Sequence, residues 1–109
     1  MLQKARRLTA PEVRAVIARG RSARTDTLSL RWLPARGFKA AVVVSKKVAG
    51  GAVDRNALRR MIYALLSEYA IDAHVVVFVQ KSLPGGARST KTALLRKDVS
   101  ALLAKVADR

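Results

Sequence analysis

The sequence contains no cysteine, a single histidine and few aromatic residues, and these absences narrow its chemistry. Without thiols the chain can form no disulfide, hold no zinc through cysteine and perform no thiolate catalysis. The histidine, His74, lies among apolar residues, where a lone imidazole usually has a structural role. Aromatic residues make up only 5% of the chain, so the core must consist mainly of valine, leucine, isoleucine and alanine.

Acidic residues and long apolar runs are also scarce. The 7 Asp and Glu residues are scattered, and no acidic pair has a metal-ligand spacing, so we expect neither a metal site nor a catalytic residue in the protein itself. No stretch approaches the roughly 20 apolar residues of a membrane span. The N-terminal residues are basic and lack the apolar segment of a signal peptide. We therefore expect a cytoplasmic protein with no membrane partner.

Positive charge is what the sequence has in excess. It contains 22 Lys and Arg residues, which gives a formal net charge of +15. Such an excess opposes folding through self-repulsion and is typical of proteins that bind a polyanion. Hydrophobic residues make up 50% of the chain, so it is not a disordered basic tail. Its length of 109 residues fits one domain, and we interpret 1–109 as a single RNA-binding domain of a monomeric protein.

Hydrophobic periodicity predicts a helix, two strands, a helix, a strand and a last helix. These elements are expected at 9–20, 25–33, 38–45, 52–69, 73–80 and from 89 or 90 to 107, with a basic loop at 21–24 and a turn at 34–37. Two apolar strands that flank a helix normally run parallel, with the helix packed on the sheet. We therefore expect helices on one face of a mixed sheet, with part of the structure open to a ligand.

The segment 45–63 carries the candidate binding chemistry. On a helix with about 100° per residue, one side of the segment is apolar and the adjoining side is cationic. The side chains of the cationic side are those of Arg55, Asn56, Arg59, Arg60 and Tyr63. Arginines fork onto phosphates, asparagine suits a ribose hydroxyl or a base edge, and tyrosine can stack or hydrogen-bond. Lys46 and Lys47 reach the same neighbourhood from the end of the preceding strand.

This segment resembles the hallmark of the bacterial ribonuclease P protein family. The resemblance lies in Ser45-Lys46-Lys47-Val48, in Ala52-Val53 and in Arg55-Asn56 with Leu58-Arg59-Arg60. Arg7-Leu8, a first helix that ends at Gly20 and a Val-rich strand after the central helix also match the family. The resemblance implies an α+β fold of order αβββαβα, with a mixed sheet like that of a ribosomal-protein domain. It also implies a left-handed crossover between parallel strands, an exception to the usual rule.

The family resemblance also implies how the work is divided between protein and RNA. An RNA subunit hydrolyses the phosphodiester with bound Mg2+, while the protein binds this ribonuclease P RNA and the 5′ leader of precursor tRNA. By position, the catalytic-RNA contacts are Lys46, Lys47, Arg55, Asn56, Arg59 and Arg60. The leader cleft, between the sheet and the first helix, is expected to be lined by Val13, Ile17, Leu28 and Arg31.

Several residues depart from the family pattern and indicate a divergent member. Ala57 stands where the Arg-Asn-Arg motif has its third residue, and Tyr63 stands where an arginine is usual. Apolar residues occupy the positions of the cleft aromatics. A ring there could come instead from Trp32 or Phe38, with Trp32 equally consistent with the core.

Other functions remain open at this point. A small basic ribosomal protein, or another protein that binds structured RNA, would share the charge and size. A DNA-binding protein could present the Arg55 helix in a major groove, although the sequence has no convincing helix-turn-helix. A nuclease that acts without RNA is disfavoured by the scattered acids.

Overall fold

The computed structural model describes residues 7–25, 27–45, 51–69, 71–80 and 88–107. Its elements are α1 (Ala10–Arg19), β1 (Arg21–Arg24), β2 (Leu28–Pro34), β3 (Lys39–Val44), α2 (Ala52–Leu66), β4 (Ala73–Val79) and α3 (Arg88–Ala107). This order is the αβββαβα arrangement that the resemblance implied. The predicted basic loop at 21–24 is wrong, because these residues form β1.

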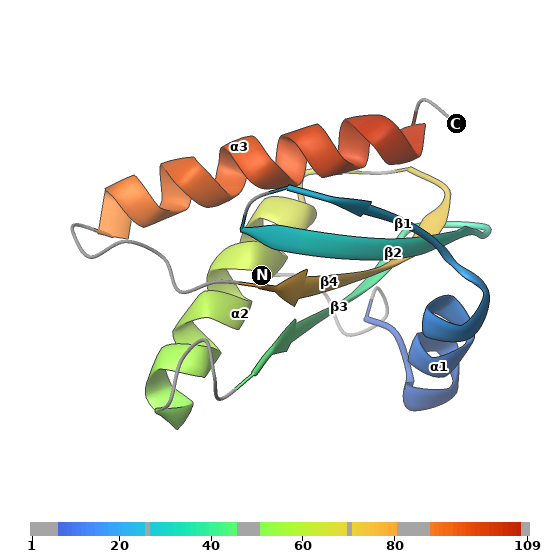
Figure 1. Cartoon of the computed structure of the whole chain (residues 1–109), viewed down its shortest axis with the longest axis horizontal. Helices are drawn as coiled ribbons and strands as arrows, with labels where there is room; N and C mark the ends of the chain where they lie inside the picture. Colours follow the sequence, from blue (N-terminus) through green and yellow to red (C-terminus); the bar gives the residue numbers. More distant parts are fainter. Residues whose placement is uncertain (1–6, 26, 46–50, 70, 81–87, 108–109) are drawn as a thin grey trace.

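The four strands form one mixed sheet in the order β1-β2-β4-β3. Strand β2 pairs antiparallel with both β1 and β4, whereas β3 pairs parallel with β4. The connection from β3 to β4 runs through α2, as expected for an apolar strand pair that flanks a helix. In Figure 1 both strands point the same way and α2 passes behind the sheet, which makes this crossover left-handed.

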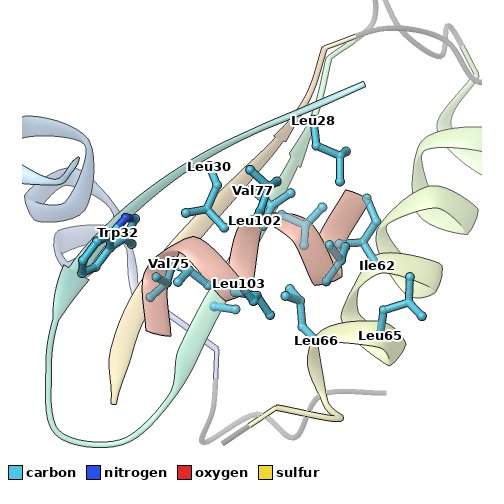
Figure 2. Close-up of a cluster of buried hydrophobic side chains, with 14 of the residues drawn as sticks. Leu28, Leu30, Trp32, Ile62, Leu65, Leu66, Val75, Val77, Leu102 and Leu103 are labelled. Carbon is cyan, nitrogen blue, oxygen red and sulfur yellow. The ribbon is translucent and has the colours of Figure 1, made fainter. Parts of the chain in front are cut away.

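The main hydrophobic core lies between one face of the sheet and the helices α2 and α3. Figure 2 shows Leu28, Leu30 and Trp32 of β2 projecting toward these helices. The hydrophobic periodicity that predicts these elements is confirmed for both helices. They supply the buried residues Ile62, Leu65 and Leu66 of α2 and Leu95, Val99, Leu102 and Val106 of α3. Leu58 of α2 and Tyr69, which follows the helix, pack against this core as partly buried residues.

Helix α1 packs on the opposite face of the sheet. Val75 and Val77 point into the main core, so alternation along β4 places Val76 on the other face. Val76 and Val16 of α1 are both fully buried, yet neither belongs to the main core cluster. The expectation that helices cover one face is therefore wrong, because α1 covers part of the second face.

Strand boundaries differ from the sequence prediction where polar residues obscure the pattern. Strand β1 has the sequence Arg-Ser-Ala-Arg and lies at the sheet edge, so no apolar alternation marks it. Thr25 and Thr27 precede β2 rather than belonging to it, and the Thr25 hydroxyl accepts a hydrogen bond from the Leu28 N–H at 3.1 Å. Helix α2 ends at Leu66 rather than at 69, and Ser67 caps it.

Candidate nucleic-acid interface

The orientation of α2 about its axis decides which of its side chains face outward. Ile62, Leu65 and Leu66 are almost completely buried and hold one side of the helix against the core. Because a helix turns by about 100° per residue, the arginines of its first half then lie on the outer side. Asn56 and Arg60 are exposed, and Arg55 and Arg59 are half-buried. The predicted cationic face of α2 therefore exists, and its apolar stripe fixes its direction.

A hollow of about 240 Å³, here called the arginine pocket, opens beside this face of α2. It is lined by Arg7, Asn56, Arg59, Arg60 and Tyr63, none of which is acidic. The guanidinium of Arg59 donates a hydrogen bond to the side-chain oxygen of Asn56. This bond fixes the amide of Asn56, whose nitrogen can donate to a phosphate or ribose oxygen. The pocket thus combines three cations with a neutral donor, which suits a phosphate group.

Tyr63 forms one wall of the arginine pocket and ties α2 to β3. Its hydroxyl oxygen accepts a hydrogen bond from the backbone N–H of Val42, at 3.2 Å. Strand β3 lies at the edge of the sheet, so none of the other strands β1, β2 and β4 pairs with it on this side. The guanidinium of Arg7 lies over the Tyr63 ring, with its carbon 4.9 Å from the ring centre. Tyr63 therefore contacts both the sheet edge and a cation of the pocket.

Arg7 reaches the pocket from the segment that precedes α1. This segment runs parallel to the edge of β3, where Arg7 forms an isolated bridge with Ala40. The next residue, Leu8, donates its backbone N–H to the Ala40 carbonyl at 3.0 Å. We did not predict Arg7 as a binding residue, since the sequence showed it only as a point of family resemblance. No local sequence pattern could place Arg7 beside the pocket residues of α2, which lie 49 or more positions later in the chain.

The second candidate region is the sheet face that α1 only partly covers, here called the open face. Alternation places Arg31 of β2, Val43 of β3 and Phe78 of β4 on this face, and Phe78 is aligned with Val43 across the parallel pair. Helix α1 lies over the end where β3 and β4 begin, and leaves their far ends uncovered (Figure 1). Val43 is 40% exposed, which is unusual for a valine in a sheet.

Of the residues predicted for the leader cleft, Val13 and Arg31 are half-buried and Ile17 is 39% exposed. Leu28 was wrongly predicted to line the cleft. It is fully buried in the main core, because the strand alternation that points Arg31 to the open face points Leu28 the other way.

The aromatic ring of the open face is not one of the two, Trp32 and Phe38, that the sequence suggested. Trp32 and Phe38 are 4% and 6% exposed, so both belong to the core and neither supplies a ring to a cleft. The ring on the open face is Phe78, which is half-buried. The sequence prediction treated 73–80 as a buried strand and therefore missed Phe78. Strand alternation, which places Phe78 on the same face as His74 and Val76, could have indicated it.

A salt bridge fixes the start of α1 against β3. The ammonium of Lys39 lies 3.2 Å from a carboxylate oxygen of Glu12. Glu12 also completes a capping box, in which it accepts the backbone N–H of Thr9 at 2.8 Å. The hydrogen bonds from Thr9 and then Lys39 lower the pKa of Glu12 from 4.5 to about 2. Glu12 is thus engaged in holding α1 and is not a candidate acid or base.

The described residues offer neither a metal site nor a membrane-spanning helix. They contain no group of three or more His, Asp or Glu side chains that could hold a metal ion. Within the same part of the chain, no helix is both long and apolar enough to cross a membrane. Lys46 and Lys47 lie outside the described residues, so their predicted place beside the pocket stays a prediction.

Comparison with known proteins identifies the family. A sequence profile named Ribonuclease P matches residues 1–107. The chain belongs to the Ribonuclease P family. Within this Ribonuclease P family, the ribonuclease P protein component of Thermus thermophilus is 36% identical to the chain over 90 residues. The alignment covers 82% of this chain and 52% of that protein, so the chain spans about half the length of the curated relatives it matches.

Solved structures of Ribonuclease P family proteins share the fold. A Staphylococcus aureus RNase P protein mutant with defective mRNA degradation activity superposes with a TM-score of 0.78 at 20% identity. That comparison covers 96% of this chain and 90% of the other. The RNase P protein from Thermotoga maritima gives a TM-score of 0.72 at 17% identity and covers 87% of this chain and 92% of the other. The mixed sheet with three helices is therefore the fold of this family.

Proposed function

We propose that this chain is the protein component of ribonuclease P. It would bind the catalytic RNA through the cationic face of α2 and the 5′ leader of precursor tRNA on the open face. It would thereby promote the endonucleolytic 5′ maturation of tRNA in the cytoplasm. The observation that carries the proposal is the arginine pocket, an acid-free cluster of cations in a member of the Ribonuclease P family.

The α2 face supports the RNA-binding part of the proposal through its chemistry. Folding does not require like charges to converge, since their mutual repulsion opposes it. A phosphate backbone compensates this repulsion, and each neutralised phosphate releases counterions. The contacts that we propose for the catalytic RNA are Lys46, Lys47, Arg55, Asn56, Arg59 and Arg60, together with Arg7 of the pocket.

The open face supports the leader-binding part of the proposal. Single-stranded nucleic acid binds to surfaces that combine apolar or aromatic side chains with cations. Here Ile17 and Val43 provide apolar surface, Phe78 provides a ring and Arg31 provides a cation. We propose that leader nucleotides lie between α1 and the far ends of β3 and β4, with Val13 at the same side of α1.

We assign the chemical step to the RNA subunit. We propose that the metal ion, Mg2+, is held mainly by the RNA; the described part of this chain contains no group of three or more His, Asp or Glu side chains that could hold one. The protein would contribute binding and charge compensation, because its cations reduce the repulsion between the catalytic RNA and its substrate.

Reconstitution tests the proposed function. The purified protein should cleave no precursor tRNA alone, and a bacterial ribonuclease P RNA with Mg2+ at low salt should trim the 5′ end faster when the protein is added. Gel analysis of the 5′ products would measure the rate. Cleavage by the protein alone, or no gain in rate on adding it to the RNA, would refute the proposal. A ribosomal role predicts copurification with ribosomal RNA instead, which sequencing of the bound RNA would reveal.

A further inference from the structure

Tyr63 has contacts that distinguish it from the other residues of the arginine pocket. One face of its ring is covered by the Arg7 guanidinium, and its hydroxyl is bound to the Val42 N–H. A base cannot stack on a ring face that a guanidinium already occupies. The direct stacking role that the sequence suggested for Tyr63 is therefore replaced, on this face, by a contact within the protein.

Arg7 depends on this contact for its position. No carboxylate in the described part of the chain pairs with it, and its Nε atom is buried without a hydrogen-bond partner. An arginine side chain has many rotamers, and a cation is attracted to the face of an aromatic ring. The bridge to Ala40 fixes the position of the Arg7 backbone, and the contact with the Tyr63 ring fixes the position of its guanidinium.

The position so fixed faces the cations of α2. Arg59 and Arg60 line the same hollow of about 240 Å³ as Arg7 and Tyr63. Three guanidinium groups from two distant segments then surround a space that is large enough for a phosphate and its sugar. Because the tyrosine is uncharged, it can bring these cations together without adding a charge of its own.

We propose that Tyr63 is a positioning residue that holds Arg7 so that Arg7, Arg59 and Arg60 bind one phosphodiester group of the RNA. This inference rests on the proposed function, since the phosphate is taken to belong to the ribonuclease P RNA. Tyr63 acts through Arg7 and contributes no direct base contact on its covered face. Its loss should therefore have the same electrostatic consequence as the loss of the arginine itself.

The salt dependence of RNA binding tests this role. For each protein, the dissociation constant for a bacterial ribonuclease P RNA is measured over a range of salt concentrations. Losing one phosphate contact makes the plot of the logarithm of the dissociation constant against the logarithm of the salt concentration less steep, by about 1 in slope. We expect this decrease for Arg7→Ala and also for Tyr63→Leu, although the latter removes no charge. The double variant, Arg7→Ala with Tyr63→Leu, should show the same decrease as either single variant, because both substitutions remove the same phosphate contact.

A matched variant separates positioning from a purely structural role. Tyr63→Phe keeps the ring and loses only the hydroxyl, so it should keep the wild-type slope even if its melting temperature falls. Tyr63→Met fills similar space without a ring and serves as a second ring-free variant if Tyr63→Leu does not fold. A wild-type slope in the folded ring-free variant, or a double variant whose slope falls by the sum of the single effects, would overturn the positioning role.

The same experiment distinguishes this inference from the proposed function. If the wild-type protein does not bind the ribonuclease P RNA at low salt, the proposed function fails. If the wild-type protein binds and the slopes of Tyr63→Leu and wild type agree, only the role of Tyr63 is wrong.

Discussion

Single residues fix how α1 meets the sheet. Gly20 follows α1, at the point where the chain turns into β1, and it lies close to the backbone of Trp32 in β2. A Cβ atom at this position would lie 2.3 Å from the Val16 carbonyl oxygen and 3.0 Å from that of Trp32. Both neighbours are backbone atoms, so they cannot move aside as a flexible side chain could. The absence of a side chain at Gly20 is what allows α1 to approach β2.

We predict that Gly20→Ala destabilises the fold by about 1–3 kcal/mol, the range typical of overpacking. Chemical denaturation at neutral pH measures this change. Gly37 offers a matched control, because it has a φ of +79° and no atom within 4 Å of an added Cβ. Asparagine tolerates that backbone conformation, so Gly37→Asn should cost less than Gly20→Ala. Equal costs would argue against the close contact at Gly20.

The capping carboxylate Glu12 gives the fold a dependence on pH. Its pKa is lowered from 4.5 to about 2 by its bonds to Thr9 and Lys39. Because this pKa is lower in the folded state than in the unfolded one, the contribution of Glu12 to the stability of the fold is fully present above about pH 4.5. This contribution is lost as the pH falls through about 2.

We therefore predict that the urea concentration at the midpoint of unfolding changes less between pH 5 and pH 2 for Glu12→Gln than for the wild type. Thr9→Ala removes the side-chain hydrogen bond of Thr9 that helps to lower this pKa and keeps the backbone one, so it should reduce this pH dependence in part. The same change of midpoint in wild type and Glu12→Gln would exclude Glu12 as its source.

At the scale of the elements, sequence prediction succeeded where one face of an element is apolar. The stripes of α2 and α3 were predicted because burial imposes a helical period on leucine, isoleucine and valine. Strand β1 was missed because an edge strand of Arg-Ser-Ala-Arg buries too little to show alternation. The contacts of Arg7 were missed for a different reason. They depend on a segment joining the edge of β3, and such a tertiary contact leaves no local pattern.

The two sides of α2 should respond differently to substitution. Ile62 is fully buried, so Ile62→Ala should lower the free energy of unfolding by about 2–5 kcal/mol. Replacing Arg55 and Arg59 together with alanine leaves the apolar stripe intact. This double variant should keep its fold, as circular dichroism would show, and bind ribonuclease P RNA more weakly in a filter-binding assay. Wild-type affinity in the folded double variant would exclude this side of α2 as the RNA contact.

At the scale of the whole molecule, the formal charge of +15 dominates the expected binding. Binding to RNA should weaken steeply with salt, because each phosphate contact releases counterions with a slope of about −0.7 to −0.9. A slope steeper than about −4 over 50–300 mM salt would correspond to several contacts, as the α2 face predicts. A titration followed by fluorescence anisotropy would measure it. A slope near zero would mean that the cations do not meet phosphates.

The position of β4 in the sheet has a consequence for how the chain folds during its synthesis. This strand lies between β2 and β3, yet it follows both of them in the sequence. Until residues up to Val79 have left the ribosome, the nascent chain can form the β1–β2 hairpin, but β3 has no partner strand. The sheet therefore assembles late, from contacts between distant residues, which is typical of slow-folding topologies.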